Sequence, residues 1–339
     1  MSVNPQRYTQ LPAWPSAYPV TGARAMLKQE LTDFKVTEIP LALPSGEGEH
    51  VWLDVVKTGA NTQYVAAQIA EFAGVRDLDV GYAGLKDRYG VTRQWFSVWM
   101  PKVQEPDFTA FEHDEFQILS QARHVKKLRP GDLLGNQFDI LLRDVEGDRA
   151  LIDANLQAIQ KGGVPNYFGA QRFGRDGDNV EQGRAMLARE IRVRNKKRKG
   201  IYLSAVRSFI FNEVLAERIH RGIWGATLEG DLLSEQGMPT GPLWGRGRLS
   251  SEGDALALES DIAGQHPLLC EGLEHAGLTQ ERRPLAARPE QFSSSRPQPD
   301  QLRLTFSLPA GYYATSLIRE ILHTEEPQRD TENEPAPVE

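Results

Sequence analysis

Cysteine is almost absent from this chain of 339 residues, because Cys270 is the only one. A single cysteine cannot form a disulfide within the chain, and it suits a reducing compartment such as the cytosol. Nor can it supply the thiolates of a zinc site, so we expect no metal. The seven histidines are spread along the chain without ligand spacing: His50, His113, His124, His220, His266, His275 and His323.

Long apolar runs are also missing. No stretch approaches the roughly 18 apolar residues that a membrane span requires, so no membrane partner is expected. The Pro-rich segment at residues 1–24 has no continuous apolar core and does not read as a secretory signal. There is no Walker A loop, no dinucleotide-binding glycine fingerprint after a strand and no serine nucleophile elbow. We therefore expect a cytoplasmic protein without a cofactor, which is either an enzyme working with side chains alone or not an enzyme.

Charge is unevenly distributed. The formal net charge is −7, and residues 324–339 carry six acids and one base, which leaves the rest of the chain near neutral. A concentrated basic run lies at residues 189–199 and ends in Lys196, Lys197, Arg198 and Lys199. Local patches, rather than net charge, attract phosphates, so this run is a candidate for binding an RNA backbone. The alternative is a solvated charged loop.

The length allows two domains with a sizeable core. Apolar alternation makes residues 302–308 the clearest strand, and we expect it to complete a sheet that begins within residues 34–143. Residues 155–302 would then be an inserted domain. Further elements are predicted by period and capping. They are strands at 51–56, 80–83, 95–100 and within 131–143, a helix from Thr62 to Gly74, a helix capped by Ser204 and ended by Gly222, and a short helix around Leu317.

Asp87 is the strongest candidate for a catalytic residue. It lies between Lys86 and Arg88 in the run Gly84-Leu85-Lys86-Asp87, just after an apolar segment, with Thr92 and Gln94 close behind. Positive neighbours favour the ionised carboxylate, which can act as a nucleophile or a general base. The alternative is that Asp87 is an ordinary turn or cap residue.

An amide and several aromatic rings are candidates for binding a base. Asn136 and Phe138 are two residues apart on a predicted strand, so both project to one face. An amide can bond a base edge and a ring can stack on its face. Phe34 and Tyr313 lie beside turns or strand ends, where binding residues often occur. The alternative places Phe138 in the core and Asn136 in a turn.

Taken together in order, separated sequence blocks resemble the D family of tRNA pseudouridine synthases (TruD). The resemblance covers nearly the whole chain, although residues 222–300 carry little of it. The blocks are Asp33-Phe34 with Glu38; Gly46 to His50; Gly84 to Asp87 with Thr92 and Gln94; Lys127 to Arg129 with Gly135 to Phe138; Pro165 to Gly174; Ser204-Ala205 with Arg207, Ser208, Phe211 and Asn212; and Leu308 to Gly311 with Ala314 and Thr315.

The resemblance implies an α+β fold, in which a pseudouridine synthase catalytic domain has a mixed or antiparallel sheet and flanking helices, and an α/β domain is inserted into it. The expected boundaries are 1–154 and 303–325 for the catalytic domain and 155–302 for the insertion. Residues 326–339 are expected to form a disordered acidic tail.

The resemblance also implies an isomerase that converts uridine to pseudouridine in tRNA, typically uridine 13 of the D arm, without a cofactor. Asp87 falls on the family's catalytic aspartate, and Phe34, Asn136, Phe138 and Tyr313 fall on its uridine-pocket positions. Position 313 is Phe in some members, so here a hydroxyl enters the pocket. Lys196, Lys197, Arg198 and Lys199 would bind the tRNA backbone, and we expect the protein to act as a monomer.

Two other functions remain open from the residues. A non-catalytic RNA-binding protein would use the same pocket and basic patches. A carboxylate-based hydrolase of nucleosides or glycosides would need a second carboxylate at a defined separation, which Glu38 or Glu49 could supply in space.

Overall fold

The computed structural model describes residues 7–101, 104–174 and 177–329. It divides the chain into two compact units, each assembled from three segments. We call residues 1–21, 150–288 and 312–321 the helical unit, and residues 22–149, 289–311 and 322–339 the sheet unit.

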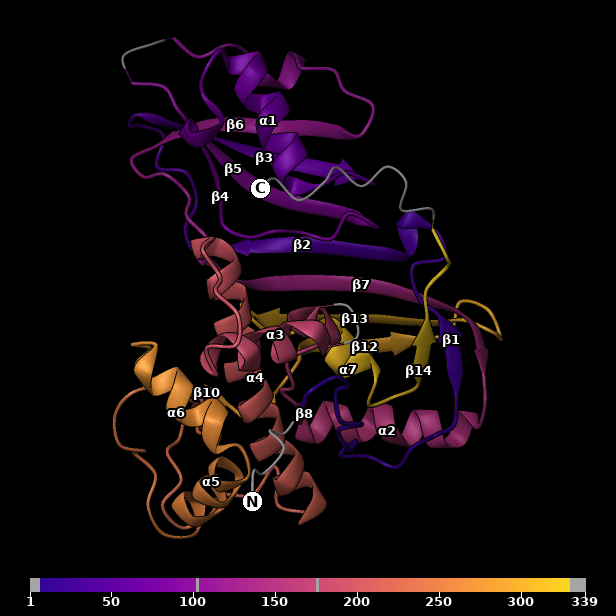
Figure 1. The fold of residues 1–339 in the computed structure, drawn as a ribbon. Helices are drawn as coiled ribbons and strands as arrows, with labels where there is room; N and C mark the ends of the chain where they lie inside the picture. The colour runs from indigo at the N-terminus through magenta and orange to yellow at the C-terminus, as the bar shows by residue number, and fades with distance from the viewer. Residues whose placement is uncertain (1–6, 102–103, 175–176, 330–339) are drawn as a thin grey trace. The chain divides into compact units, whose positions relative to one another are not determined.

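A ten-stranded sheet dominates the described part of the sheet unit. Its strands are β1 (Arg24–Met26), β2 (Phe34–Pro40), β3 (His50–Thr58), β4 (Val80–Tyr82), β5 (Val91–Trp99), β6 (Phe116–His124), β7 (Leu133–Glu146), β12 (Glu290–Ser295), β13 (Leu302–Pro309) and β14 (His323–Glu325). The main path runs β12-β13-β7-β2-β5-β3-β6, with β4 beside β5, and with β1 between β7 and β14 (Figure 1). The pairs β2–β5 and β1–β14 are parallel and the others antiparallel, so the sheet is mixed, as expected.

Strand β13 joins the sheet where the sequence pattern predicts. It runs antiparallel to β7, with Leu302 opposite Leu142 and Pro309 opposite Gly135. The alternating Leu302, Leu304, Phe306 and Leu308 are all buried, because a strand places every second side chain on one face. The prediction that this late segment completes the sheet is confirmed.

One amphipathic helix, α1 (Thr62–Ala73), covers the β3-β5-β6 part of the sheet (Figure 1). Val65 and Ile69 of the helix are fully buried in one cluster with Leu53 of β3 and Phe96 of β5. Gly74 ends the helix with φ 66°, a left-handed conformation that glycine adopts without steric cost. The sheet unit also holds three short 3₁₀ turns, η1 (Leu31–Asp33), η2 (Asp77–Asp79) and η3 (Phe108–Ala110).

The described part of the helical unit is built mainly from six helices. They are α2 (Arg149–Gly162), whose first residue falls in the sheet unit, α3 (Asp178–Leu187), α4 (Lys196–His220), α5 (Gly253–Gln265), α6 (Pro267–His275) and α7 (Ala314–Ile318). A short 3₁₀ turn, η4 (Ala170–Phe173), and two small antiparallel ladders complete it. The ladders pair β9 (Thr240–Leu243) with β10 (Glu281–Pro284) and β8 (Val164–Pro165) with β11 (Ala286–Ala287).

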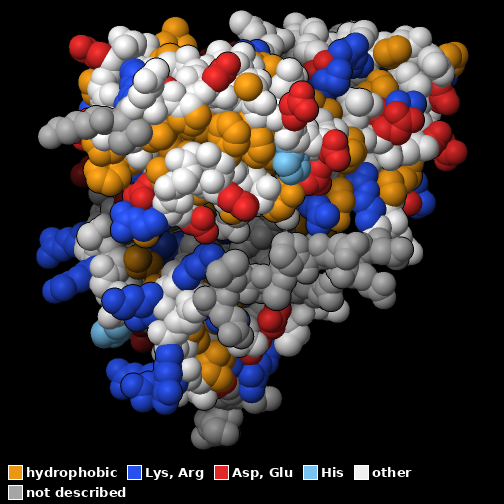
Figure 2. All heavy atoms as spheres, turned by 90° about the horizontal axis from the view of Figure 1, so that it is seen from above, with side chains coloured by type: hydrophobic (Ala, Val, Ile, Leu, Met, Phe, Trp, Pro, Cys, Tyr) orange, Lys and Arg blue, Asp and Glu red, His pale blue; other side chains and the backbone are white. Residues whose placement is uncertain are grey.

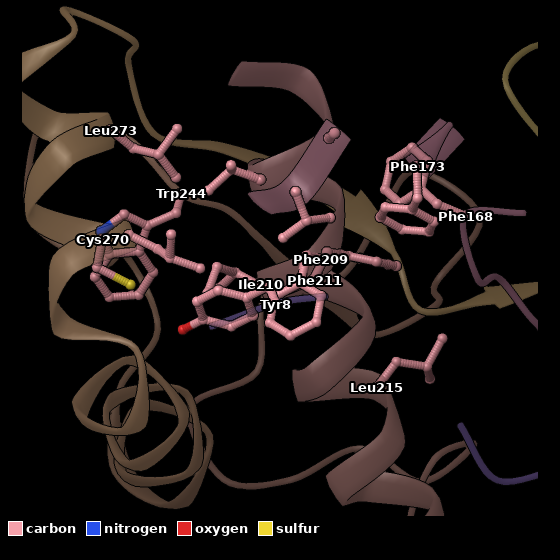
Figure 3. Packing of buried hydrophobic residues seen from close by; sticks show 14 of the residues in the cluster. Tyr8, Phe168, Phe173, Phe209, Ile210, Phe211, Leu215, Trp244, Cys270 and Leu273 are labelled. Carbon is pink, nitrogen blue, oxygen red and sulfur yellow. The ribbon is translucent and has the colours of Figure 1, made fainter. Parts of the chain in front are cut away.

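Helix α4 is the core element of the helical unit. Phe209, Ile210 and Phe211 lie in its central turns and pack with Cys270 of α6 and with Tyr8 from the N-terminal segment (Figure 3). The helix begins at Lys196, where the Asn195 side chain accepts a hydrogen bond from the Arg198 backbone N–H. The prediction that Ser204 caps this helix is wrong, since Ser204 lies well inside it.

The division into units differs from the expected domain boundaries, because residues 1–21 and 312–321 group with the helical unit and residues 289–302 group with the sheet unit. Which part is catalytic and which is inserted stays a prediction. Of the acidic tail, residues 330–339 lie outside the described residues, whereas Glu326 forms an ion pair with Lys28 at 3.3 Å. Among the helices described, none combines the length and the apolar character needed to cross a membrane.

Candidate active site

Asp87 lies in the loop that joins β4 to β5, and its side chain is 54% exposed. A carboxylate in this position is open to a ligand and is not part of the packed interior. The loop has no helix or strand geometry of its own. Its conformation therefore depends on buried side chains that hydrogen-bond to its backbone.

Two buried side chains hold the start of this loop. Gln94 on β5 donates from Nε2 to the Gly84 carbonyl at 3.1 Å. The Thr62 hydroxyl donates to Gln94 Oε1 at 2.9 Å and accepts the Lys86 backbone N–H at 3.0 Å. Thr62 is the first helical residue of α1, and Asn61 occupies the N-cap position, so the Thr62 side chain does not cap the helix. Its hydroxyl serves the loop instead.

Lys57, the next-to-last residue of β3, holds the loop at Asp87 itself. Its ammonium donates to the Asp87 carbonyl and to the Ala60 carbonyl, both at 2.7 Å. The side chain is fully buried, and this burial lowers the pKa of Lys57 to about 8. The Asp87 charge acts in the opposite direction and favours the ammonium.

The cation that faces the Asp87 carboxylate is Lys28. Its Nζ lies 3.9 Å from Asp87 Oδ1, and its side chain is almost buried. The sequence neighbours of Asp87 turn elsewhere, because Lys86 pairs with Glu38 and Arg88 donates from Nε to the Gly59 carbonyl at 3.3 Å. The electrostatic support of Asp87 therefore comes from residues distant in sequence.

Asn136 is brought to the same loop through Lys86. The Lys86 ammonium donates to Asn136 Oδ1 at 2.7 Å and lies 3.0 Å from Glu38 Oε2. An ammonium has only donors, so the Asn136 atom that it contacts is the amide oxygen. The amide N–H groups of Asn136 then point away from Lys86 and are the groups that can donate to a base edge.

Phe34 and Phe138 form an aromatic wall beside Lys28. The Lys28 Nζ lies 4.6 Å from the Phe34 ring centroid, and Phe34 meets Phe138 edge-on at 6.4 Å. Phe138 in turn stacks on Phe306 of β13 at 5.2 Å. Both Phe34 and Phe138 are largely buried, so little of either ring is open to a ligand in this structure.

Tyr313, the fifth predicted site residue, belongs to the helical unit. Its hydroxyl accepts a hydrogen bond from Arg172 Nη2 at 2.9 Å, and its ring lies 6.2 Å from that of Phe168. The structure thus brings four of the predicted site residues together in the sheet unit: Asp87, Phe34, Asn136 and Phe138. Tyr313 lies in the helical unit, where it contacts Arg172 and Phe168.

The last four residues of the basic run form the first turn of α4, and all four side chains are exposed: Lys196, Lys197, Arg198 and Lys199. Cations at a helix N-terminus oppose the helix dipole, so their presence is not explained by helix stability. Figure 2 shows Lys and Arg side chains gathered in groups on the face in view, beside areas where both signs alternate.

In the sheet unit, the Asp87 carboxylate beside the Lys28 ammonium can support acid–base or nucleophilic chemistry. Among the residues that the structure describes, no group of three or more His, Cys, Asp or Glu side chains is placed to hold a metal ion. If the protein were a carboxylate-based hydrolase, Glu38 could be its second catalytic acid. However, Glu38 is buried and paired with Lys86. It is therefore poorly placed to act as a free catalytic carboxylate.

Sequence reasoning missed Lys28 and Lys57 as site residues. The sequence pattern could have pointed to Lys57. This lysine continues the alternation of Val51, Leu53 and Val55 and so lies on the same, apolar face of β3. A charge at a core position requires a partner. Lys28 carried no comparable signal, because it lies in a short connection without a motif.

Comparisons with known proteins agree on one family. A sequence profile described as "tRNA pseudouridine synthase D (TruD)" matches residues 17–194 and 234–321. The match includes residues 234–300, where motifs alone showed little, and leaves out the basic run at 196–199.

Similar proteins cover nearly the same length. The tRNA pseudouridine synthase D of Aeromonas hydrophila is 42% identical over 335 residues, covering 92% of this chain and 94% of that protein. The protein of the same name from Xanthomonas campestris is 41% identical over 347 residues, covering 91% and 94%. A crystal structure of a "Putative tRNA pseudouridine synthase D (TruD)" from Methanosarcina mazei shares the fold, with a TM-score of 0.68 at 21% identity and coverage of 93% and 96%.

Proposed function

This chain belongs to the tRNA pseudouridine synthase D family, whose members are isomerases that make pseudouridine in tRNA, and we propose that Asp87 carries this chemistry here. The observation that supports the assignment is the environment of its carboxylate. It is exposed to a ligand, it faces Lys28 at 3.9 Å, and its own carbonyl is held by Lys57 at 2.7 Å. A catalytic carboxylate must be both accessible and positioned, and Asp87 meets both requirements.

The proposed reaction exchanges two bonds at C1′ of the target nucleotide. The uridine is turned out of its stack into the site. Asp87 either attacks C1′ or removes a proton from the sugar, and the N1–C1′ bond breaks. The released uracil turns and C5 bonds to C1′, as the bond from C1′ to Asp87 breaks in the first case or as the sugar regains its proton in the second. The proton then lost from C5 is matched by one gained at N1. No electrons are gained or lost overall and no water is consumed, so the substrate and the side chains suffice.

Asn136 and the rings are proposed to hold the base. The Asn136 amide N–H groups can donate to a uracil carbonyl, because Lys86 occupies the amide oxygen. Phe34 and Phe138 would supply an apolar wall beside Lys28, and Tyr313 is proposed to supply a stacking ring. Uridine 13 of the D arm is the proposed target, which rests on the family resemblance.

The basic run is proposed to bind tRNA phosphates. Replacing Lys196 and Lys197 together by Met should weaken tRNA binding and lower the slope of log Kd against log salt concentration by about 1 to 2, as expected for two lost phosphate contacts. If affinity and slope are unchanged, the run is only an exposed surface.

The sheet unit, which holds Asp87, is the proposed catalytic part. The proposed insertion, expected at residues 155–302, would then end at residue 288, because residues 289–311 group with the sheet unit. We further propose that the protein acts as a monomer in the cytoplasm. Sedimentation of the purified protein with and without tRNA tests the first of these two points, and fractionation of cells tests the second.

The deciding experiment incubates the purified protein with an unmodified tRNA transcript and maps pseudouridine. Asp87→Asn should abolish product while tRNA affinity stays within about twofold of the wild type, because the amide keeps the shape and loses the charge. Product at position 13 is expected. Full activity of Asp87→Asn would remove Asp87 from the chemistry, and product at another position would overturn the target assignment.

The same assay separates the alternatives. A non-catalytic RNA-binding protein would bind the transcript and give no pseudouridine. A hydrolase would release free uracil and leave an abasic site, which chromatography of the reaction mixture would detect.

A further inference from the structure

Arg172 in the helical unit has partners that orient its guanidinium without neutralising it. Its Nη1 donates to Ser204 Oγ at 3.1 Å and its Nη2 to Tyr313 Oη at 2.9 Å. Both partners are neutral hydroxyl oxygens. Its Nε is buried and has no hydrogen-bond partner among the described residues. A planar guanidinium held in this way keeps its full charge and at least one unused donor.

Other arginines of the same unit differ in this respect. Each of three is paired with a carboxylate at short range: Arg184 with Glu181 and Glu190, Arg218 with Asp231, and Arg282 with Glu259. Partly buried cations are usually compensated in this way, because an unpaired charge is costly to desolvate. For Arg172, no acid lies within ion-pair distance in the part of the chain that the structure describes.

A second guanidinium adds to the positive charge at this place. Arg283 lies over the Phe168 ring at 4.2 Å from the centroid, and Arg172 lies 5.5 Å from the same centroid. Burial lowers the pKa of Arg283 to about 10, and the charge of Arg172 acts in the same direction. Two cations that share one aromatic ring repel each other, and a bound anion would relieve this repulsion.

We propose that Arg172 binds a backbone phosphate of the RNA substrate, with Arg283 as a second cation and with Ser204 and Tyr313 as positioning residues. The inference rests on the RNA substrate of the proposed function. A phosphodiester fits because guanidinium N–H groups bind phosphate oxygens with matching geometry and charge. The hydroxyl at position 313 also gains a role, since it accepts a hydrogen bond that fixes Arg172.

The test measures binding without turnover, in the Asp87→Asn background. The Kd of an unmodified tRNA transcript is measured at several KCl concentrations for this protein and after adding Arg172→Met. We expect binding about tenfold weaker and a salt slope smaller by about 1, because one phosphate contact is lost. The matched control is Arg221→Met, which removes an exposed arginine directly after α4 that is paired with Glu217 at 2.7 Å. It should change neither quantity.

Two further variants separate charge from structure. Arg172→Lys keeps the charge and should restore the salt slope while recovering only part of the affinity. Tyr313→Phe keeps the ring and Arg172 but removes one tether, so we expect about threefold weaker binding with an unchanged slope. Thermal melting of each variant shows whether it is folded.

The outcomes distinguish this inference from the proposed function. If Arg172→Met is folded and binds tRNA with unchanged affinity and slope, the phosphate assignment is wrong, even when the wild type forms pseudouridine. If inorganic phosphate raises the melting temperature of the wild type but not of Arg172→Met, and tRNA binding is unaffected, the site takes free phosphate and the proposal is also overturned. Absence of pseudouridine with normal Arg172-dependent binding would instead refute only the catalytic assignment.

Discussion

Lys28 Nζ lies close to both the Asp87 carboxylate and the Phe34 ring, 3.9 Å from Oδ1 and 4.6 Å from the ring centroid. The ammonium thus joins the charged and aromatic parts of the site. Its second acidic partner is Glu326, whose Oε1 lies 3.3 Å away. Of its two ionic contacts, the one with Asp87 involves the proposed catalytic group and the one with Glu326 does not. The two contacts can therefore be tested separately.

Replacing Lys28 by Met should lower kcat by about 100-fold, because Asp87 loses the cation that stabilises its charge. The Kd for tRNA should change little, since one residue beside the carboxylate contributes few phosphate contacts. Single-turnover kinetics and a binding isotherm measure the two effects. Glu326→Gln is the matched control and should retain near wild-type kcat. Equal loss in both variants would mean that Lys28 acts through the C-terminal segment instead.

Breaking the Lys86–Glu38 pair should be strongly destabilising. The two side chains are 6% and 1% exposed, so Lys86→Met leaves a buried carboxylate without its cation at a cost of about 3–5 kcal/mol. Adding Glu38→Gln should restore much of that loss, because the uncompensated charge is removed. Urea unfolding of both single variants and of the double variant gives the coupling energy. Simple additivity of the two single effects would contradict a direct pair.

The Thr62 hydroxyl should matter to the loop more than to α1. Thr62→Val keeps the side-chain shape but removes the acceptor for the Lys86 N–H and the donor to Gln94, at a cost of about 1–3 kcal/mol. Hydrogen exchange of the Lys86 backbone amide should be faster in Thr62→Val than in the wild type, because this N–H has lost its acceptor. Thr62→Ser retains the hydroxyl and should preserve both protection and activity. An unchanged exchange rate in Thr62→Val would show that the loop is held without this bond.

Lys57 should make stability depend on pH in the alkaline range. Its folded pKa of about 8 lies below its ordinary value of 10.5, so the unfolded chain binds more protons between these values. Stability from this group is therefore fully present above pH 10.5 and is lost as pH falls through about 8. Relative to Lys57→Met, the wild-type free energy of unfolding should rise by about 3 kcal/mol across that window. A constant difference between the two proteins would exclude this titration.

The sheet and the loop that holds Asp87 were predictable because their signals are local. Alternating apolar residues at 302–308 specify a strand, and a strand buried on one face must pair within a sheet. Asp87 follows a short strand and is flanked by residues typical of an exposed loop. Asn136 and Phe138 share a face because they are two residues apart on β7.

The start of α4 was predicted wrongly because its first turn carries four cations and no acid. Such a turn opposes the helix dipole, so local preference favours a later start at Ser204. Tertiary packing overrides this preference, since the helix buries a long apolar face. Ser204 has a different role as the acceptor for Arg172.

The partners of Asp87 could not be predicted because they meet only after the sheet has formed. Lys57 lies on β3, which pairs with β5, and Lys28 lies in the connection after β1. No spacing along the chain relates either lysine to Asp87. The flanking cations Lys86 and Arg88 gave a plausible but different answer, because backbone direction in the loop turns them toward Glu38 and Gly59.

The pairing of β7 with β13 also has a consequence for synthesis on the ribosome. Strand β7 emerges before the bulk of the helical unit, and β13 emerges after it. During translation, one edge of β7 therefore stays without its final neighbour, and an open strand edge can pair with other nascent chains. A chain released before residue 302 would keep this edge, so premature termination should yield protein that depends on chaperones and is prone to aggregate.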